Sequence, residues 1–142
     1  MWAKFKTKFK FIKAAGGIVS TQNDELLIIK RNGFFDLPKG HFKKNETASK
    51  AAIREVAEEC GIHSHYIIDD DPIITYHVYK LDGEIILKET QWFKMKTKDL
   101  ESLIPQKEEG IEEALWMSNS KINQNINLFY PSLFDLLGAP SQ

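Results

Sequence analysis

Lysines and phenylalanines alternate at the start of the chain. Lys4, Lys6, Lys8 and Lys10 occupy one set of positions, and Phe5, Phe9 and Phe11 fall in the other. Because successive side chains of a strand point to opposite faces, this period of two predicts a half-buried strand over residues 2–11 with a lysine face.

Apolar runs predict the next strands. Ala14–Val19 and Leu26–Ile29 have the composition of buried strands, and the polar segment Thr21–Asp24 predicts a turn between them. A short apolar run, Phe34–Leu37, ends at Pro38, which has no backbone N–H to donate to a sheet.

Residues 46–60 are rich in alanine and glutamate and contain neither glycine nor proline, which predicts a helix. Thr47 or Asn45 is suited to cap its start. Gly61 stands where a left-handed residue ends a helix.

The second half of the chain mixes both element types. Ile73–Leu81 and Glu84–Met95 are strand-like runs separated by Asp82–Gly83, a strong hairpin signal. An acidic loop, Glu108–Glu113, precedes a further strand at residues 115–117.

A short helix is expected to begin within Ser118–Asn125, and Tyr130–Leu137 has the pattern of a terminal amphipathic helix. This mixture, with a hairpin in its middle, favours a mixed sheet packed by helices over a doubly wound parallel sheet.

The composition sets the class of protein. The 142 residues fit one domain, 1–142, with an ordinary apolar fraction of 42%. A single cysteine excludes a disulfide within one chain and favours a reducing compartment. No apolar run is long enough to span a membrane, and lysines interrupt any signal-peptide core, so we expect a cytoplasmic location.

Three glutamates of the predicted helix carry the first candidate chemistry. At about 100° per residue, Glu55, Glu58 and Glu59 lie within an arc of about 100°. Three anions so close together repel one another, and a hard divalent cation such as Mg²⁺ offsets that repulsion and also binds substrate phosphates. A solvated acidic helix face is the alternative interpretation.

The residues around these glutamates decide between the two interpretations. The stretch is Gly40-x5-Glu46-x7-Arg54-Glu55-Val56-x-Glu58-Glu59-x-Gly61-Ile62. It resembles the Nudix box of the Nudix hydrolases at every position. At average composition such a match arises by chance with odds on the order of one in 10⁷.

This resemblance implies a fold and an activity. The fold is a mixed β-sheet sandwiched between helices, an α-β-α sandwich of the α+β or α/β class. The activity is hydrolysis of a phosphoanhydride bond in a nucleoside diphosphate derivative, with Mg²⁺ or Mn²⁺ as the cofactor.

The resemblance also assigns roles to residues of the box. Glu55, Glu58, Glu59 and the Gly40 carbonyl match metal-binding positions. Arg54 and Glu46 match residues that hold the ligand carboxylates in place. A carboxylate at such a site can take the proton of the attacking water.

Many Nudix hydrolases use a further glutamate from a late loop. Glu108, Glu109, Glu112 and Glu113 compete for this role here. We favour Glu109, because Gly110 gives its backbone freedom to approach the site. A solvated acidic turn is the alternative for each of the four.

The loop Pro38–Lys39–Gly40–His41 resembles the branch that hydrolyses dinucleoside polyphosphates. Lys39 and His41 would flank the metal site and meet additional phosphates. Tyr79, 17 residues past the box, matches a tyrosine of that branch and is suited to stack on adenine. Arg31 is a further candidate for substrate binding, with a rim ion pair as its alternative.

Other functions remain open at this stage. A pyrophosphatase that removes oxidised nucleoside triphosphates shares the same box, because the residues that select the base lie outside it. A nucleotide-binding sensor without catalysis is less favoured, since no box glutamate is lost.

The lysine strand has three interpretations: edge protection, attraction of a polyanionic substrate, and RNA binding. A net charge of −1 makes nucleic acid the least favoured partner. The expected partner is a small nucleotide, and the sequence leaves open whether the protein is a monomer or a homodimer. Cys60, near the end of the predicted helix, is interpreted as a small buried apolar residue.

Overall fold

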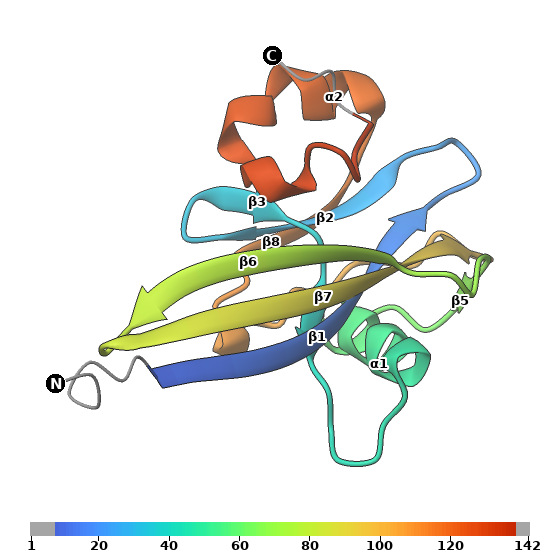
Figure 1. Cartoon of the computed structure of the whole chain (residues 1–142). Coiled ribbons are helices and arrows are strands. Elements are labelled where there is room, and N and C mark those ends of the chain that lie inside the picture. The colour runs from blue at the N-terminus through green and yellow to red at the C-terminus, as the bar shows by residue number, and fades with distance from the viewer. Residues whose placement is uncertain (1–7, 139–142) are drawn as a thin grey trace, which may run out of the picture.

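A computed structural model describes residues 8–138 of the chain (Figure 1). Eight strands form one sheet, in which β3, β2, β1, β7 and β5 are neighbours in that order, β4 also pairs with β1, β6 with β7 and β8 with β2. The strands are β1 (Lys8–Ser20), β2 (Leu26–Arg31), β3 (Phe34–Asp36), β4 (Lys39–His41), β5 (His65–Ile67), β6 (Ile73–Leu81), β7 (Glu84–Thr97) and β8 (Glu113–Met117).

Strand pairing confirms the expected mixed sheet. β1 and β7 run parallel along the whole length of β1, from Lys8 opposite Glu84 to Ser20 opposite Lys96. The other pairings are antiparallel. The Asp82–Gly83 hairpin is also confirmed, with φ of 51° and 78°, as a two-residue turn of this kind requires.

Alternation along the central strands divides the core into two layers. Leu27 and Ile29 face one layer with Val56 of helix α1 (Ala48–Cys60), and Ile28 faces the other with Trp92. Helix α2 (Asn119–Gln124) and the 3₁₀ helices Ile126–Leu128 and Pro131–Leu133 supply the second layer. The sheet therefore lies between helices, as the sequence predicts (Figure 1).

Helix α1 begins two residues later than predicted and ends where expected. The Thr47 hydroxyl caps its start by accepting from the Lys50 N–H at 3.3 Å. Gly61, with φ of 72°, ends it in the left-handed conformation and donates to the Ala57 carbonyl. The two caps thus fix both ends of the helix.

Two predictions about the ends of the chain are corrected. Residues 8–11 of the strand predicted over 2–11 and the run Ala14–Val19 belong to one strand, β1, and residues 2–7 lie outside the described part. The predicted burial of its phenylalanine face is wrong, because Phe9 and Phe11 are 74% and 53% exposed. The strand extends past the helix that would have covered that face.

The predicted helix Tyr130–Leu137 is also wrong. The segment forms the 3₁₀ helix Pro131–Leu133 followed by turns. Leu133 and Leu137 are buried as their spacing predicts. Its backbone bonds run mainly from residue i to i−3, as from the Leu133 N–H to the Tyr130 carbonyl and from the Phe134 N–H to the Pro131 carbonyl, and do not form the i→i−4 series of an α-helix.

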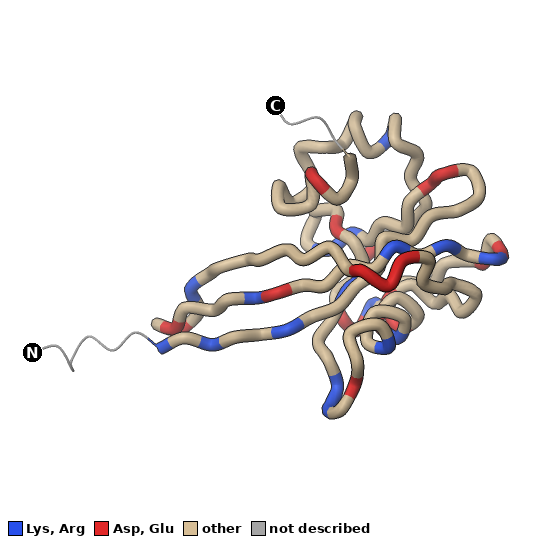
Figure 2. Tube along the Cα trace, turned by 45° about the vertical axis from the view of Figure 1, so that its right-hand side comes forward, with Lys and Arg blue, Asp and Glu red and all other residues tan. Residues whose placement is uncertain are grey.

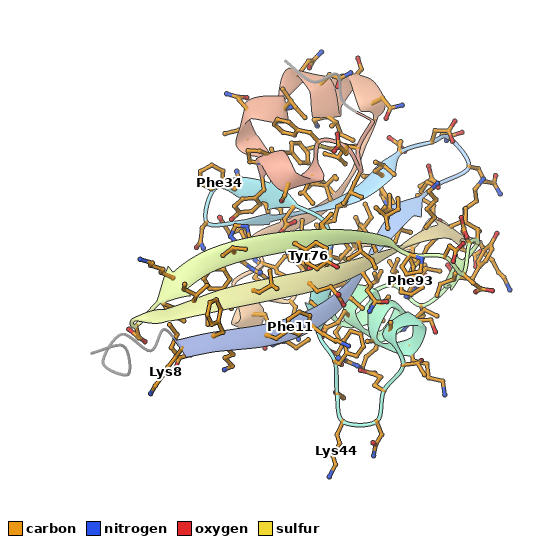
Figure 3. The ribbon with its side chains drawn as sticks, in the orientation of Figure 1. Lys8, Phe11, Phe34, Lys44, Tyr76 and Phe93 are labelled. Atoms are coloured by element: carbon orange, nitrogen blue, oxygen red, sulfur yellow. The ribbon has the colours of Figure 1, made fainter. Side chains whose placement is uncertain are left out.

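The outer halves of three strands form an arm that extends beyond the body (Figures 1 and 3). It consists of β1 residues 8–13, β6 residues 76–81 and β7 residues 84–89. Within residues 8–138, Lys8–Lys13 pair with β7 alone, so this part of β1 is a sheet edge, and lysines are spaced along it (Figure 2). Edge protection by lysine suits that position.

Helix α1, the longest in the described range 8–138, is neither long nor apolar enough to cross a membrane, and the others are shorter still.

Candidate active site

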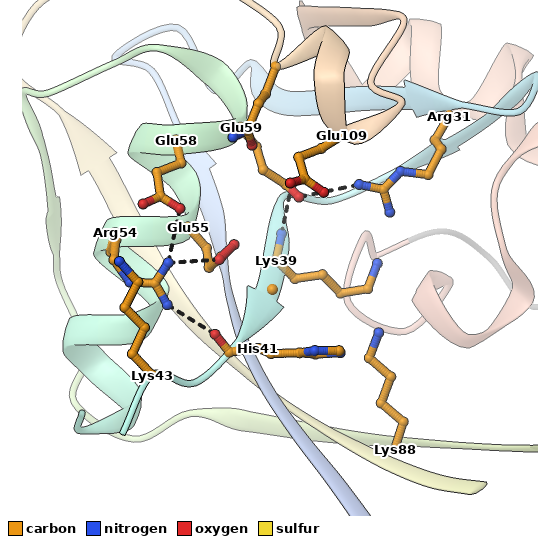
Figure 4. A pocket seen from close by; sticks show the side chains of 12 residues that line it. Arg31, Lys39, His41, Lys43, Arg54, Glu55, Glu58, Glu59, Lys88 and Glu109 are labelled. Carbon is orange, nitrogen blue, oxygen red and sulfur yellow. Dashed lines mark hydrogen bonds and ion pairs between the residues drawn. The ribbon is translucent and has the colours of Figure 1, made fainter. Parts of the chain in front are cut away.

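The box residues meet where helix α1 approaches strand β4. Five of them line a cavity of about 400 Å³ (Figure 4): Gly40, Arg54, Glu55, Glu58 and Glu59. The other lining residues are Arg31, Lys39, His41 and Glu109, which were expected from the sequence, and Lys43, Lys88 and Gln106, which were not. A Cβ at position 40 would collide with the Glu55 carboxylate. Glycine therefore lets that carboxylate lie against the β4 backbone.

Arg54 connects four acceptors at one side of the cavity. Its Nε and Nη2 donate to the two carboxylate oxygens of Glu46 at 2.7 and 2.9 Å. Its Nη1 donates to Glu55 Oε1 and Glu58 Oε1, both at 2.9 Å, and Nη2 also donates to the His41 carbonyl at 3.0 Å. These bonds lower the pKa of Glu46 to about 2, while burial raises that of Glu55.

Glu59 lies deeper and has different partners. Its side chain is 6% exposed. Its two oxygens accept from the Lys39 backbone N–H at 3.1 Å and from Arg31 Nη2 at 3.3 Å. Burial outweighs these partners and raises the pKa of Glu59 to about 7. The three box glutamates are thus on one face, as predicted, but in two electrostatic environments.

The donor atoms fit a hard divalent cation. Carboxylate oxygens from Glu55, Glu58 and Glu59 and a backbone carbonyl at Gly40 are the oxygen ligands that Mg²⁺ and Mn²⁺ accept. Among residues 8–138, no three acidic, histidine or cysteine side chains are already gathered as a ligand set. Arg54 holds one oxygen each of Glu55 and Glu58 and leaves the other free of a protein partner.

The late acidic loop places one glutamate in the cavity. Glu109 ends the 3₁₀ helix Lys107–Glu109, and Gly110 follows with φ of 82°. Glu112 instead accepts from the Gly33 N–H, and Glu113 pairs with Lys30 at 3.7 Å. Glu108 does not line the cavity. The structure therefore brings Glu109, and not its three competitors, beside the box (Figure 4).

A second cavity, of about 700 Å³, adjoins the first. The two share three lining residues, and all three are cationic: Arg31, Lys39 and Lys88. The remaining walls come from β6, β7 and the C-terminal segment, and they include Asp36, Thr75, Tyr76, His77, Tyr79, Thr90, Trp92 and residues 130–133. The glutamates of the first cavity and the aromatic rings of the second are thus joined by a row of three cationic residues.

The predicted substrate residues are divided between the cavities. His41 lines the first, and burial and two nearby lysines lower its pKa. Tyr79 lines the second, with its ring centroid 5.4 Å from that of His77. The Lys39 ammonium pairs with Asp36 and lies 5.8 Å from the centre of the Trp92 ring. The predicted set is therefore brought together around the two cavities.

Two residues at this junction were missed by sequence reasoning. Lys88 is partly buried, and its pKa is lowered by burial and by Lys39 and Arg31. The signal that could have found it is its place in the alternation of β7, on the same face as the buried Ile86, Thr90 and Trp92. Asp36, which is 6% exposed, directly precedes Leu37–Pro38 and follows an apolar run. A carboxylate at the end of a buried strand is the signal that could have found it.

Cys60 is fully buried in the core layer beneath α1, as predicted. Burial raises the pKa of its thiol, so the thiol stays protonated.

Comparison with known proteins identifies the family. Residues 10–137 match the model of the NUDIX domain, and the chain belongs to that family. This confirms, at the level of the family, the expected hydrolase of phosphoanhydride bonds.

Solved structures share the fold at low identity. An Ap4A hydrolase from C. elegans, in a binary complex, is similar with a TM-score of 0.66 and 21% identity, over 89% of this chain and 93% of that one. A MutT protein from Methanosarcina mazei Go1 has a TM-score of 0.65 and 17% identity, over 94% of both chains.

A bifunctional NMN adenylyltransferase/ADP ribose pyrophosphatase from Francisella tularensis, complexed with AMP and a Mn ion, also shares the fold. Its TM-score is 0.65 and its identity 18%, over 96% of this chain but 42% of that one.

Proposed function

We propose that this protein is a metal-dependent pyrophosphohydrolase that cleaves a phosphoanhydride bond of a dinucleoside polyphosphate. The observation that carries the proposal is the junction of the two cavities. A cavity that holds four carboxylates, three of them suited to bind a divalent cation, is joined to a larger one with aromatic walls, and the residues common to both are Arg31, Lys39 and Lys88.

The arrangement suits a long polyanion with a base at its end. Phosphates that pass from one cavity to the other meet three positive charges, and lysine supplies a compact charge for such contacts. The base enters the second cavity, where Tyr79 offers a ring for stacking. A nucleoside triphosphate has fewer phosphates to span the same row. The similarity to an Ap4A hydrolase structure is compatible with this substrate class.

Glu55, Glu58, Glu59 and the Gly40 carbonyl would hold the cation, Mg²⁺ or Mn²⁺. When bound, it neutralises phosphate oxygens and activates water for attack. Arg54 and Glu46 fix the carboxylates of Glu55 and Glu58 through the bonds described above.

Proton transfer and substrate binding fall to the remaining residues of the two cavities. Glu59, with its raised pKa, and Glu109 are the carboxylates placed to accept a proton from the attacking water. His41 and Arg31 complete the contacts with the phosphates.

The test is a substrate panel in the presence of Mg²⁺. We expect kcat/KM for diadenosine tetraphosphate to exceed that for any nucleoside triphosphate, including oxidised GTP. Glu58→Gln should lower kcat at least 10²-fold, and Glu108→Gln, on the same acidic surface but outside the cavity, should leave it unchanged.

Two outcomes would contradict the proposal. A higher kcat/KM for oxidised GTP would identify a nucleotide-pool sanitising enzyme instead. Tight nucleotide binding without turnover under Mg²⁺ or Mn²⁺ would identify a sensor.

A further inference from the structure

Asp36 is a buried carboxylate with two partners at the wall of the second cavity. Its Oδ1 accepts from the Leu37 backbone N–H at 2.8 Å, and its Oδ2 pairs with the Lys39 ammonium. The side chains are 8% and 16% exposed, respectively. Each charge therefore depends on the other, because water reaches neither of them well.

Lys39 contacts two carboxylates, that of Asp36 through its ammonium and that of Glu59 through its backbone N–H. The bond to Glu59 Oε1 is 3.1 Å long, so the Lys39 backbone is already beside the carboxylate cluster. Its charge also lowers the pKa of Glu59. A flexible four-carbon stem allows the ammonium to turn toward Glu59 or away from it.

In this structure the ammonium is turned away. The Lys39 side chain ends in the same region as those of Lys88 and Arg31, on the far side of the cavity from Arg54 (Figure 4). It pairs with Asp36 rather than with Glu59, although Glu59 is close and only 6% exposed. Asp36 is the group that decides between the two directions.

We propose that Asp36 is a positioning residue that keeps the Lys39 ammonium out of the carboxylate cluster and directs it toward the phosphates of the substrate. The inference rests on the proposed function, since it supposes a cation bound by that cluster. Without Asp36, the ammonium pairs with Glu59 and competes with the divalent cation for the same negative charge. Even at the dielectric constant of bulk water, a positive charge brought within about 7 Å of a divalent cation weakens its binding about tenfold.

Asp36 also acts on the neighbouring lysine. Lys39 and Arg31 lower the pKa of Lys88, and the negative charges of Asp36 and Glu59 partly offset that lowering. Two lysines beside one buried carboxylate repel each other less than two lysines alone. The Asp36 carboxylate thus favours the charged form of the Lys88 ammonium.

The experiment measures Mn²⁺ binding to the full-length protein without nucleotide, by electron paramagnetic resonance titration. Four proteins are compared: wild type, Asp36→Asn, Lys39→Met, and the double variant. We expect Asp36→Asn to bind Mn²⁺ about tenfold more weakly than wild type. Lys39→Met and the double variant should both bind at least as tightly as wild type, because the competing ammonium is gone.

The double variant separates positioning from damage to the fold. A merely structural role for Asp36 would leave it as weak as Asp36→Asn, which would overturn the proposal. Asparagine keeps the acceptor for the Leu37 N–H. Should Asp36→Asn fail to fold, Asp36→Ser takes its place in the same comparison, because a hydroxyl also accepts that bond. Asp36→Glu, which restores the charge, should recover tight binding.

Failure of this inference differs from failure of the proposed function. Equal Mn²⁺ affinity in all four proteins would overturn the role of Asp36 alone. No Mn²⁺ binding in any of them would overturn the proposed metal dependence, and this inference with it.

Discussion

Arg54 and Glu46 form a two-bond pair across eight residues of sequence, with Nε and Nη2 of the guanidinium on the two oxygens of one carboxylate. The side chains are 19% and 13% exposed. The remaining N–H groups of Arg54 bind Glu55, Glu58 and the His41 carbonyl. Glu46 therefore orients the Arg54 guanidinium, and Arg54 in turn orients Glu55 and Glu58, two of the proposed metal ligands.

This pair makes stability depend on acid pH. The pKa of Glu46 is lowered to about 2, so its contribution to stability is complete above the unfolded-state value of 4.5 and is lost as the pH falls toward 2. We expect Glu46→Gln to be less stable than wild type at pH 7, by on the order of 1 kcal/mol. The two should converge between pH 5 and pH 2, as followed by urea unfolding at each pH.

Glu101 provides the control for that prediction. Its pKa is also lowered to about 2, by backbone bonds from His63 and Ser64 far from the cavity. Glu101→Gln should show the same acid convergence but keep its catalytic rate, whereas Glu46→Gln should lose activity 10- to 100-fold. Unchanged activity in Glu46→Gln would contradict the role given to this pair.

Alanine at position 40 should separate folding from catalysis. The atoms that a Cβ at Gly40 would meet belong to the end of the Glu55 side chain, which can move. We expect Gly40→Ala to fold with a small change in melting temperature and to lose about 10² in kcat/KM, because the carboxylate is displaced. At Gly16 the obstacles are the Pro38 carbonyl and Trp92, so Gly16→Ala should instead lose stability. Equal loss of stability in both would refute this distinction.

Removal of the Lys88 ammonium should affect binding without harming the fold. Its lowered pKa means that the folded protein carries this charge at a cost, so Lys88→Met should melt no lower than wild type. The KM for diadenosine tetraphosphate should rise about tenfold with little change in kcat. Lys80→Met, on the same hairpin but outside both cavities, serves as the control. A KM that stays at the wild-type value would remove Lys88 from the phosphate path.

Tyr79 should act through its ring rather than its hydroxyl. Stacking of a base on an aromatic ring contributes about 1–3 kcal/mol, so Tyr79→Ala should weaken binding of adenine nucleotides by about 5- to 100-fold. Tyr79→Phe should bind as wild type does. Tyr66→Ala removes an exposed ring away from the cavities and controls for surface effects. Isothermal titration with a non-hydrolysable analogue measures all four proteins.

Local sequence signals predicted most of the fold. The caps at Thr47 and Gly61 and the Asp82–Gly83 turn are each specified by a few neighbouring residues, so they were readable in advance. The exposure of Phe9 and Phe11 could not be predicted, because it depends on how far β1 extends past α1 in the folded protein. The short strands β4 and β5 were missed for the same reason, since their partners are distant in sequence.

The site was predictable to the extent that it lies in one helix and one loop. The box defined Glu55, Glu58 and Glu59 as one face, and Gly110 indicated Glu109 among four candidates. Asp36 pairs with Lys39 three residues away, but outside a helix that spacing does not indicate a contact. Lys88 approaches Lys39 from the distant strand β7. Sequence reasoning therefore found the carboxylate cluster of the first cavity and missed the junction with the second one.

The arm described above forms part of the wall of the second cavity. His77 and Tyr79 of β6 and Lys88 of β7 line that cavity. They lie where β6 is mostly exposed and where Phe9 and Phe11 of β1 are more than half exposed. Segments with little buried apolar surface open at a lower free energy than the core. Amide hydrogens of β6 should thus exchange with solvent long before those of β2. A nucleotide bound against Tyr79 should slow that exchange. The substrate would then order the part of the cavity wall that binds it.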